Sequence, residues 1–143
     1  MRNILKKQLK LEIRAFTLLE SLLCLFLLTG LLVLFSSSIQ VTMRQTREAL
    51  FYKDFEALYR DSQVLAIQSN QLVDLKVGGR EISNGVETVS IPDSIQSVQS
   101  YHIRFDPSNG GNSSLQKIVF QGEEKQVVYQ LYLGSGRYKK TEG

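Results

Sequence analysis

Hydrophobic residues follow three successive patterns, and the first is a continuous apolar stretch at residues 16–35 (FTLLESLLCLFLLTGLLVLF). A helix of about 20 residues rises roughly 30 Å, which matches the hydrocarbon core of a membrane. Glu20 is the only charged residue in this stretch, and an ionised carboxylate there requires a partner or a function. The pattern therefore predicts a transmembrane helix with one unusual acidic position.

The second pattern, over residues 36–70, is amphipathic. Phe51, Phe55, Leu58 and Leu65 follow one another at steps of 4, 3 and 7 residues, which places them on one helix face. Further apolar positions are Met43, Leu50 and Ile67. Charges of both signs on the opposite face predict a solvated surface, and they are Arg44, Arg47, Glu48, Lys53, Asp54, Glu56, Arg60 and Asp61. One helix is therefore expected from about residue 16 to residue 69.

The third pattern, over residues 71–143, is alternation broken by turn signals at Gly78-Gly79 and Asn84-Gly85. A longer apolar run covers residues 95–105, and residues 115–121 and 125–133 form the clearest predicted hairpin. The pattern predicts a four- to six-stranded antiparallel sheet against which the amphipathic helix packs, an α+β fold. The polar ending after Gly136 is expected to be a frayed, solvated tail.

Charge is concentrated in the first 14 residues, which hold five Lys and Arg against one Glu. The whole chain has a net charge of +3 and a pI of about 9.0, so the remainder carries −1 and has no general attraction to a polyanion. A basic flank before an apolar span keeps the N-terminus in the cytoplasm. The C-terminal domain is therefore expected outside the membrane.

Few residues could support catalysis or metal binding. The single cysteine, Cys24, has no disulfide partner, and the single histidine, His102, excludes two-histidine metal sites. We therefore expect no enzyme activity, no catalytic residues, no metal and no cofactor.

The segment at residues 14–23 (RAFTLLESLL) resembles the class III signal of type IV pilins and pseudopilins, although Ala15 stands where glycine is usual. The resemblance implies that prepilin peptidase cuts between Ala15 and Phe16 and that Phe16 is then N-methylated. It also implies that Glu20 pairs with the terminal ammonium of a neighbouring subunit during assembly. Residues 1–15 would then be a removed leader.

The ending at residues 131–138 (LYLGSGRY) is similar to that of ComGD-type minor pilins of Gram-positive competence pili. This similarity implies a structural subunit of the pilus that captures DNA in natural transformation, with other pilins, prepilin peptidase and the membrane as partners. DNA would be reached through the assembled pilus. Candidate direct DNA contacts are Arg137, Tyr138, Lys139 and Lys140.

The sequence therefore predicts four regions: a leader (1–15), a transmembrane and assembly helix (16–35), its amphipathic continuation (36–70) and an extracytoplasmic β-domain (71–143). Four alternatives stay open. The chain could be a pseudopilin of a type II-like secretion system, or a secreted protein whose conventional signal peptide is cut near residues 36–38. It could also be an unprocessed single-span anchor, or a secreted enzyme.

Overall fold

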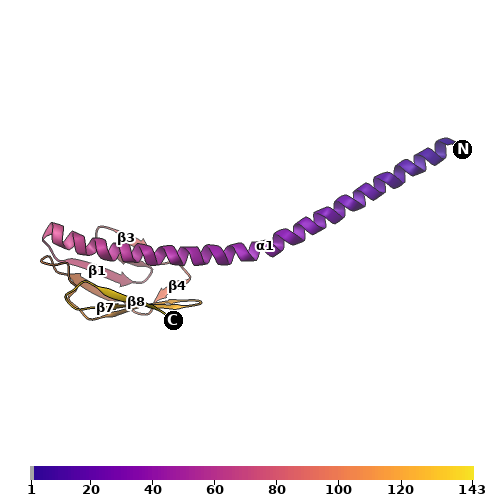
Figure 1. The fold of residues 1–143 in the computed structure, drawn as a ribbon. Coiled ribbons are helices and arrows are strands. Elements are labelled where there is room, and N and C mark those ends of the chain that lie inside the picture. The colour runs from indigo at the N-terminus through magenta and orange to yellow at the C-terminus, as the bar shows by residue number, and fades with distance from the viewer. Residues whose placement is uncertain (1) are drawn as a thin grey trace. The chain divides into compact units, whose positions relative to one another are not determined.

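The computed structural model describes the backbone of residues 2–143 and the side chains of residues 17–36 and 39–143 (Figure 1). One helix, α1 (Arg2–Ser69), precedes eight strands, as the α+β prediction requires. The strands are β1 (Val73–Gly78), β2 (Glu81–Ser83), β3 (Thr88–Ser90), β4 (Ile95–Ser97), β5 (Tyr101–Phe105), β6 (Lys117–Gly122), β7 (Gln126–Leu131) and β8 (Tyr138–Glu142). The chain divides into two compact units, Met1–Met43 and Arg44–Gly143.

α1 ends at Ser69, where the sequence pattern places its end. Asn70 adopts a left-handed conformation with φ 52°. The Asn70 N–H donates to the Ile67 carbonyl and the Gln71 N–H donates to the Ala66 carbonyl, both at 3.3 Å. These bonds satisfy carbonyls that the end of a helix leaves free, and asparagine is one of the few residues that tolerates this backbone conformation.

The strands form two four-stranded antiparallel sheets, in the orders β3-β2-β1-β5 and β4-β6-β7-β8. The sequence predicted one sheet of four to six strands. The difference arises in the apolar run at residues 95–105, which divides because β4 pairs with β6 whereas β5 pairs with β1. Ser97 Oγ donates to the Gln99 carbonyl at 2.7 Å within the turn between them.

The second half of α1 lies along the strands (Figure 1) and packs on them through aromatic rings. Phe51 and Phe55 each lie edge-on to Phe120 with 5.2 Å between ring centroids. We call this contact the helix–sheet seam, and its rings are Phe51, Tyr52, Phe55 and Tyr59 of α1 with Phe105, Phe120 and Tyr129 of the strands. Each edge-to-face pair contributes about 0.5–1.5 kcal/mol beyond the burial of its area.

The predicted helix stripe is confirmed at its centre, where Phe51, Phe55 and Leu58 are buried, and Leu65 is partly buried. The same buried surface includes three positions that the stripe omitted: Tyr52, Tyr59 and Ala66. In contrast, Met43, Leu50 and Ile67 are about half exposed. Two sheets cover a wider arc of α1 than one row of contacts would, which explains the added residues.

The prediction of a uniformly solvated polar face was wrong at three positions, one of which is Glu56, 26% exposed and paired with Lys140 of β8. Glu48 is only 7% exposed. Arg44 forms ion pairs with Glu123 and Glu124, the latter at 3.0 Å, because the turn between β6 and β7 reaches the side of α1. Charges on this face therefore help to position the hairpin.

The β2–β3 hairpin turns at Asn84-Gly85, as predicted, with Gly85 at φ 87°. The Asn84 side chain is buried, and its Oδ1 accepts bonds from the Val86 and Glu87 N–H groups at 3.0 and 2.8 Å. Its Nδ2 donates to Ser62 Oγ of α1 at 3.0 Å, and Ser62 Oγ donates to the Leu58 carbonyl at 2.6 Å. One buried hydroxyl therefore attaches the hairpin to the helix.

The expected frayed tail is in fact strand β8, so that prediction was wrong. β8 pairs with β7 from Leu131↔Tyr138 to Val127↔Glu142. Gly134 and Gly136, at φ 71° and 63°, allow the chain to reverse before β8. The Gly136 carbonyl accepts a 2.7 Å bond from Gln63 Nε2, which fixes the turn to α1.

We predict that Ser62→Ala lowers the free energy of unfolding of the full chain by about 1–3 kcal/mol, because the buried Asn84 amide then lacks its acceptor. The matched control is Ser69→Ala. Ser69 Oγ also donates to a carbonyl four residues earlier, but it is exposed, so a change within about 0.5 kcal/mol is expected. Urea unfolding in neutral detergent, followed by near-UV circular dichroism, gives both values. Equal effects of the two substitutions would contradict this role of Ser62.

Candidate functional site

Every described side chain between residues 17 and 36 is exposed. Phe26 is 76% exposed and Leu32 71%. By length and composition, the helix that contains this segment suffices to cross a membrane. Leaving it in water would sacrifice about 1.5–3 kcal/mol per large apolar side chain, so the segment requires lipid or neighbouring helices.

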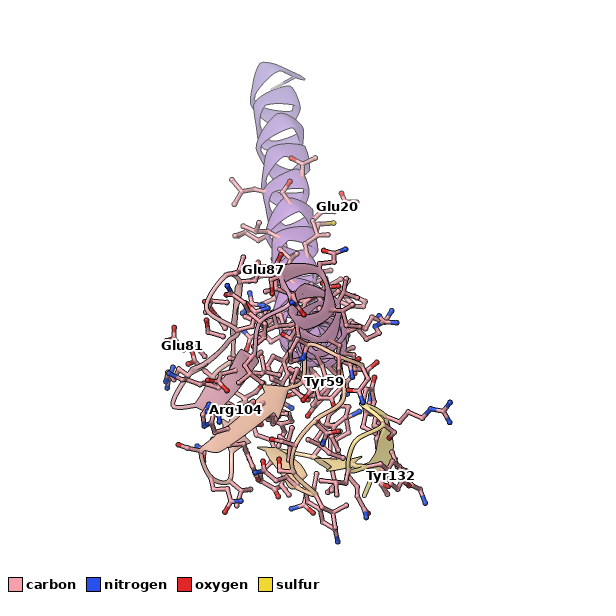
Figure 2. All side chains as sticks on the ribbon, turned by 90° about the vertical axis from the view of Figure 1, so that its left-hand side faces the viewer. Glu20, Tyr59, Glu81, Glu87, Arg104 and Tyr132 are labelled. Carbon is pink, nitrogen blue, oxygen red and sulfur yellow. The ribbon has the colours of Figure 1, made fainter. Side chains whose placement is uncertain are left out.

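Glu20 lies within this exposed segment, on the first part of α1 (Figure 2). The nearby hydroxyl of Ser21 already donates to the Thr17 carbonyl at 2.8 Å, and that of Thr29 to the Leu25 carbonyl at 2.7 Å. Among the described side chains no ion pair involves Glu20. Within the described side chains, its carboxylate is therefore left for a partner from another molecule.

The predicted cleavage and methylation positions, Ala15 and Phe16, lie in α1. Their side chains lie outside the described residues.

Of the four predicted DNA-contact residues, Arg137 directly precedes β8 and the other three begin it, so strand alternation separates them onto two faces. Tyr138 is half-buried and points into the seam, 5.4 Å between ring centroids from both Tyr59 and Tyr129. Burial is the main cause that raises the pKa of Tyr138, and the negative charge of Glu56 is the second. Lys140 lies on the same face of β8 as Tyr138, whereas Arg137 and Lys139 alternate to the opposite face.

Lys140 is engaged by partners of the seam. Its Nζ lies 3.3 Å from Glu56 Oε1 and 3.2 Å from Glu142 Oε1, and 5.2 Å from the centre of the Tyr52 ring. Hydrogen bonds from Lys125 and then from Lys140 lower the pKa of Glu142. With the side chain 31% exposed, Lys140 serves β8 attachment more than it serves an external ligand.

The Tyr129 hydroxyl donates to Glu56 Oε1 at 2.9 Å. Burial is the main cause that raises the pKa of the Tyr129 phenol, and this hydrogen bond is the second. Burial also raises the pKa of Tyr52 to about 12, with Glu48 as the second cause. These phenols therefore stay protonated at neutral pH, and Glu56 joins α1, β7 and β8 through Tyr129 and Lys140.

The single histidine lies in a surface ion cluster. Asp74 Oδ1 accepts a 2.9 Å bond from Arg104 Nε and lies 3.2 Å from His102 Nε2. The Arg104 hydrogen bond, more than its charge, lowers the pKa of Asp74. The residues with described side chains include no group of three or more His, Cys, Asp or Glu residues that could hold a metal ion.

A groove of about 500 Å³ lies between the end of α1 and the β2–β3 hairpin and is bounded by Leu65, Leu72, Asp74 and Asn84. Two exposed residues, Lys117 and Tyr132, were not selected from the sequence as candidate contacts. The alternation of residues 125–133 already placed Tyr132 on the face opposite Tyr129, so the sequence pattern could have indicated its exposure.

We predict that Tyr129→Phe lowers the free energy of unfolding by about 1–2 kcal/mol, because Glu56 loses a hydrogen bond in a partly buried position. Tyr59→Phe is the matched control, since both rings lie edge-on to Tyr138 at 5.4 Å. The Tyr59 hydroxyl is buried without a hydrogen-bond partner in the described part of the chain. Tyr59→Phe should therefore be neutral or stabilising in urea unfolding at pH 7. A larger loss from Tyr59→Phe than from Tyr129→Phe would contradict the assigned bonds.

No family model and no solved structure matches the chain. The chain is 42% identical over 133 residues to competence protein ComGD of Streptococcus pneumoniae strain R6. The aligned region covers 93% of this chain and 82% of that protein. The match extends over both the apolar helix and the β-domain, because it leaves only a small part of the chain uncovered. The chain therefore belongs to the ComGD family of competence proteins, the minor-pilin family that its ending resembles.

Proposed function

We propose that this chain is a minor pilin of the competence pilus, a structural subunit with which other pilins assemble for DNA uptake in transformation. The observation that carries the proposal is the difference in burial between the two halves of α1. Its second half is buried on the sheets of its own chain, whereas residues 17–36 are exposed and apolar. A helix of this kind suits lipid before assembly and neighbouring pilin helices afterwards.

We further propose that prepilin peptidase removes residues 1–15 on the cytoplasmic side of the membrane and that Phe16 becomes N-methylated. The leader, Ala15-Phe16 and the residues that follow support this step by their resemblance to the pilin signal. Cleavage there would remove the basic leader and retain the apolar helix. The β-domain would lie outside the membrane, first as a single-span protein and then in the pilus at the cell surface.

Glu20 would pair with the Phe16 ammonium of an adjacent subunit. Opposite charges attract strongly in a medium of low dielectric, and pairing relieves the penalty of leaving either charge alone in an apolar environment. The hydroxyls of Ser21 and Thr29 bond within the helix, so they do not compete for such a partner. A charge pair at this position would fix the register between subunits more than it would add stability.

We predict that Glu20→Gln leaves cleavage intact but lowers the amount of subunit in pili about tenfold or more, because the neighbour's ammonium would be buried without a counter-charge. Cys24→Ala is the control, since Cys24 is exposed in the same segment. Immunoblots of sheared pili and of membranes, together with transformation frequency, measure both effects. Normal incorporation and transformation of Glu20→Gln would show that Glu20 is merely solvated.

A further inference from the structure

In the sheet β4-β6-β7-β8, the outer face of the three strands β6, β7 and β8 contains no carboxylate. Alternation directs Ile118, Phe120, Val127, Tyr129 and Leu131 toward α1, where all are buried. The outward positions of the three strands are Lys117, Val119, Gln121, Gln126, Val128, Gln130, Lys139 and Thr141. Amides and cations thus dominate a face that has no acid to offset them.

The cations are arranged in register across the strands. Lys117 pairs with Gln130, and Gln130 pairs with Lys139, so these three residues form one row across β6, β7 and β8. Two strand spacings separate the lysine backbones by roughly 10 Å. Arg137 lies two residues before Lys139, and its carbonyl accepts a 3.0 Å bond from the Tyr132 N–H.

These three cations are free of competing acids. Within the described part of the chain, every ion pair involves a different cation: Arg44, Arg80, His102, Arg104, Lys125 or Lys140. Glu142, the acid of β8, is held on the seam side by Lys125 and Lys140. Lys117, Arg137 and Lys139 therefore keep their charge for an external anion.

An aromatic ring lies beside this row. Tyr132 is 43% exposed, and Figure 2 shows it at the strands on the side away from α1. Among the described aromatic residues it makes no ring contact, whereas Tyr129 and Tyr138 are both enclosed by neighbours. The Tyr132 N–H donates to the Arg137 carbonyl, and an exposed ring at this place offers a surface on which an unpaired base can stack.

The turn that carries this edge is fixed in place. The bond from Gln63 Nε2 to the Gly136 carbonyl attaches it to α1, and a Cβ at position 136 would lie only 2.0 Å from that nitrogen. Arg137 and Lys139 are therefore presented from a preformed strand edge. Binding would order few backbone torsions, which favours affinity.

We infer that this surface, the basic face formed by Lys117, Gln130, Tyr132, Arg137 and Lys139, binds the phosphodiester backbone of DNA and stacks an unpaired base on Tyr132. Each strand of duplex DNA has one phosphate for about every 3.4 Å of helix axis, so several fall within reach of the three cations. The inference rests on the proposed function, because a subunit assembled in a surface pilus can meet extracellular DNA. It replaces the contiguous run of residues 137–140 with a surface drawn from β6, β7 and β8.

The test is fluorescence anisotropy of labelled single-stranded and duplex oligonucleotides with the full chain in neutral detergent. The triple variant Lys117→Gln, Arg137→Gln, Lys139→Gln should weaken binding of both forms about tenfold or more at low salt and reduce the duplex salt slope by about 2–3. A matched triple, Arg47→Gln, Lys53→Gln, Arg60→Gln, removes the same charge from exposed positions of α1 and should change affinity less than about threefold. The basic leader is common to all variants, so it does not affect their comparison.

Tyr132→Ala should weaken binding of the single strand about tenfold and leave the duplex nearly unchanged, because only an unpaired base can stack on the ring. Unchanged DNA binding by the basic-face triple, an equal loss from the α1 triple, or tighter binding of anionic phospholipid vesicles than of DNA would each overturn the inference. Pilus incorporation of the basic-face triple is measured in parallel and should be normal. Absence of the unmodified chain from pili would instead refute the proposed function, whatever the binding result.

Discussion

Aromatic packing between one face of α1 and the inner faces of two sheets is the interaction on which the C-terminal unit depends. Phe120 contacts Phe51 and Phe55 at once, and Tyr138 lies edge-on to both Tyr59 and Tyr129. These rings bring the last strand, the central strands and the helix into one core. Large buried aromatic groups suit this task because each covers much apolar area in a chain that has no disulfide.

The seam also determines which polar groups are available outside it. Glu56 accepts from Tyr129 and pairs with Lys140, so these groups attach β7 and β8 to α1. Strand alternation leaves Arg137 and Lys139 on the other side. The same packing therefore attaches β8 through one set of residues and exposes a second set, which explains how a nearly neutral domain presents a surface of one charge sign.

Some elements could be predicted from the sequence because local patterns encode them. The spacing of Phe51, Phe55 and Leu58 predicted the buried face of α1, and Asn84-Gly85 predicted the turn of the β2–β3 hairpin. The division of residues 95–105 could not be predicted, because alternation does not reveal which neighbour a strand pairs with. β8 was missed because Tyr138 is its only apolar residue, and backbone bonds and ion pairs hold the rest. The basic face was hidden because its members are separated by up to 22 positions in the chain, from Lys117 to Lys139, and become neighbours only through strand register.

Our central claim is that the exposed apolar helix is kept in the mature subunit and used for assembly. The most direct test is the intact mass of this chain recovered from pili sheared from competent cells. We predict a chain that begins at Phe16, carries one added methyl group and retains residues 17–36. A chain that begins after residue 38 would contradict the claim, because the apolar helix would then have been discarded as a signal peptide.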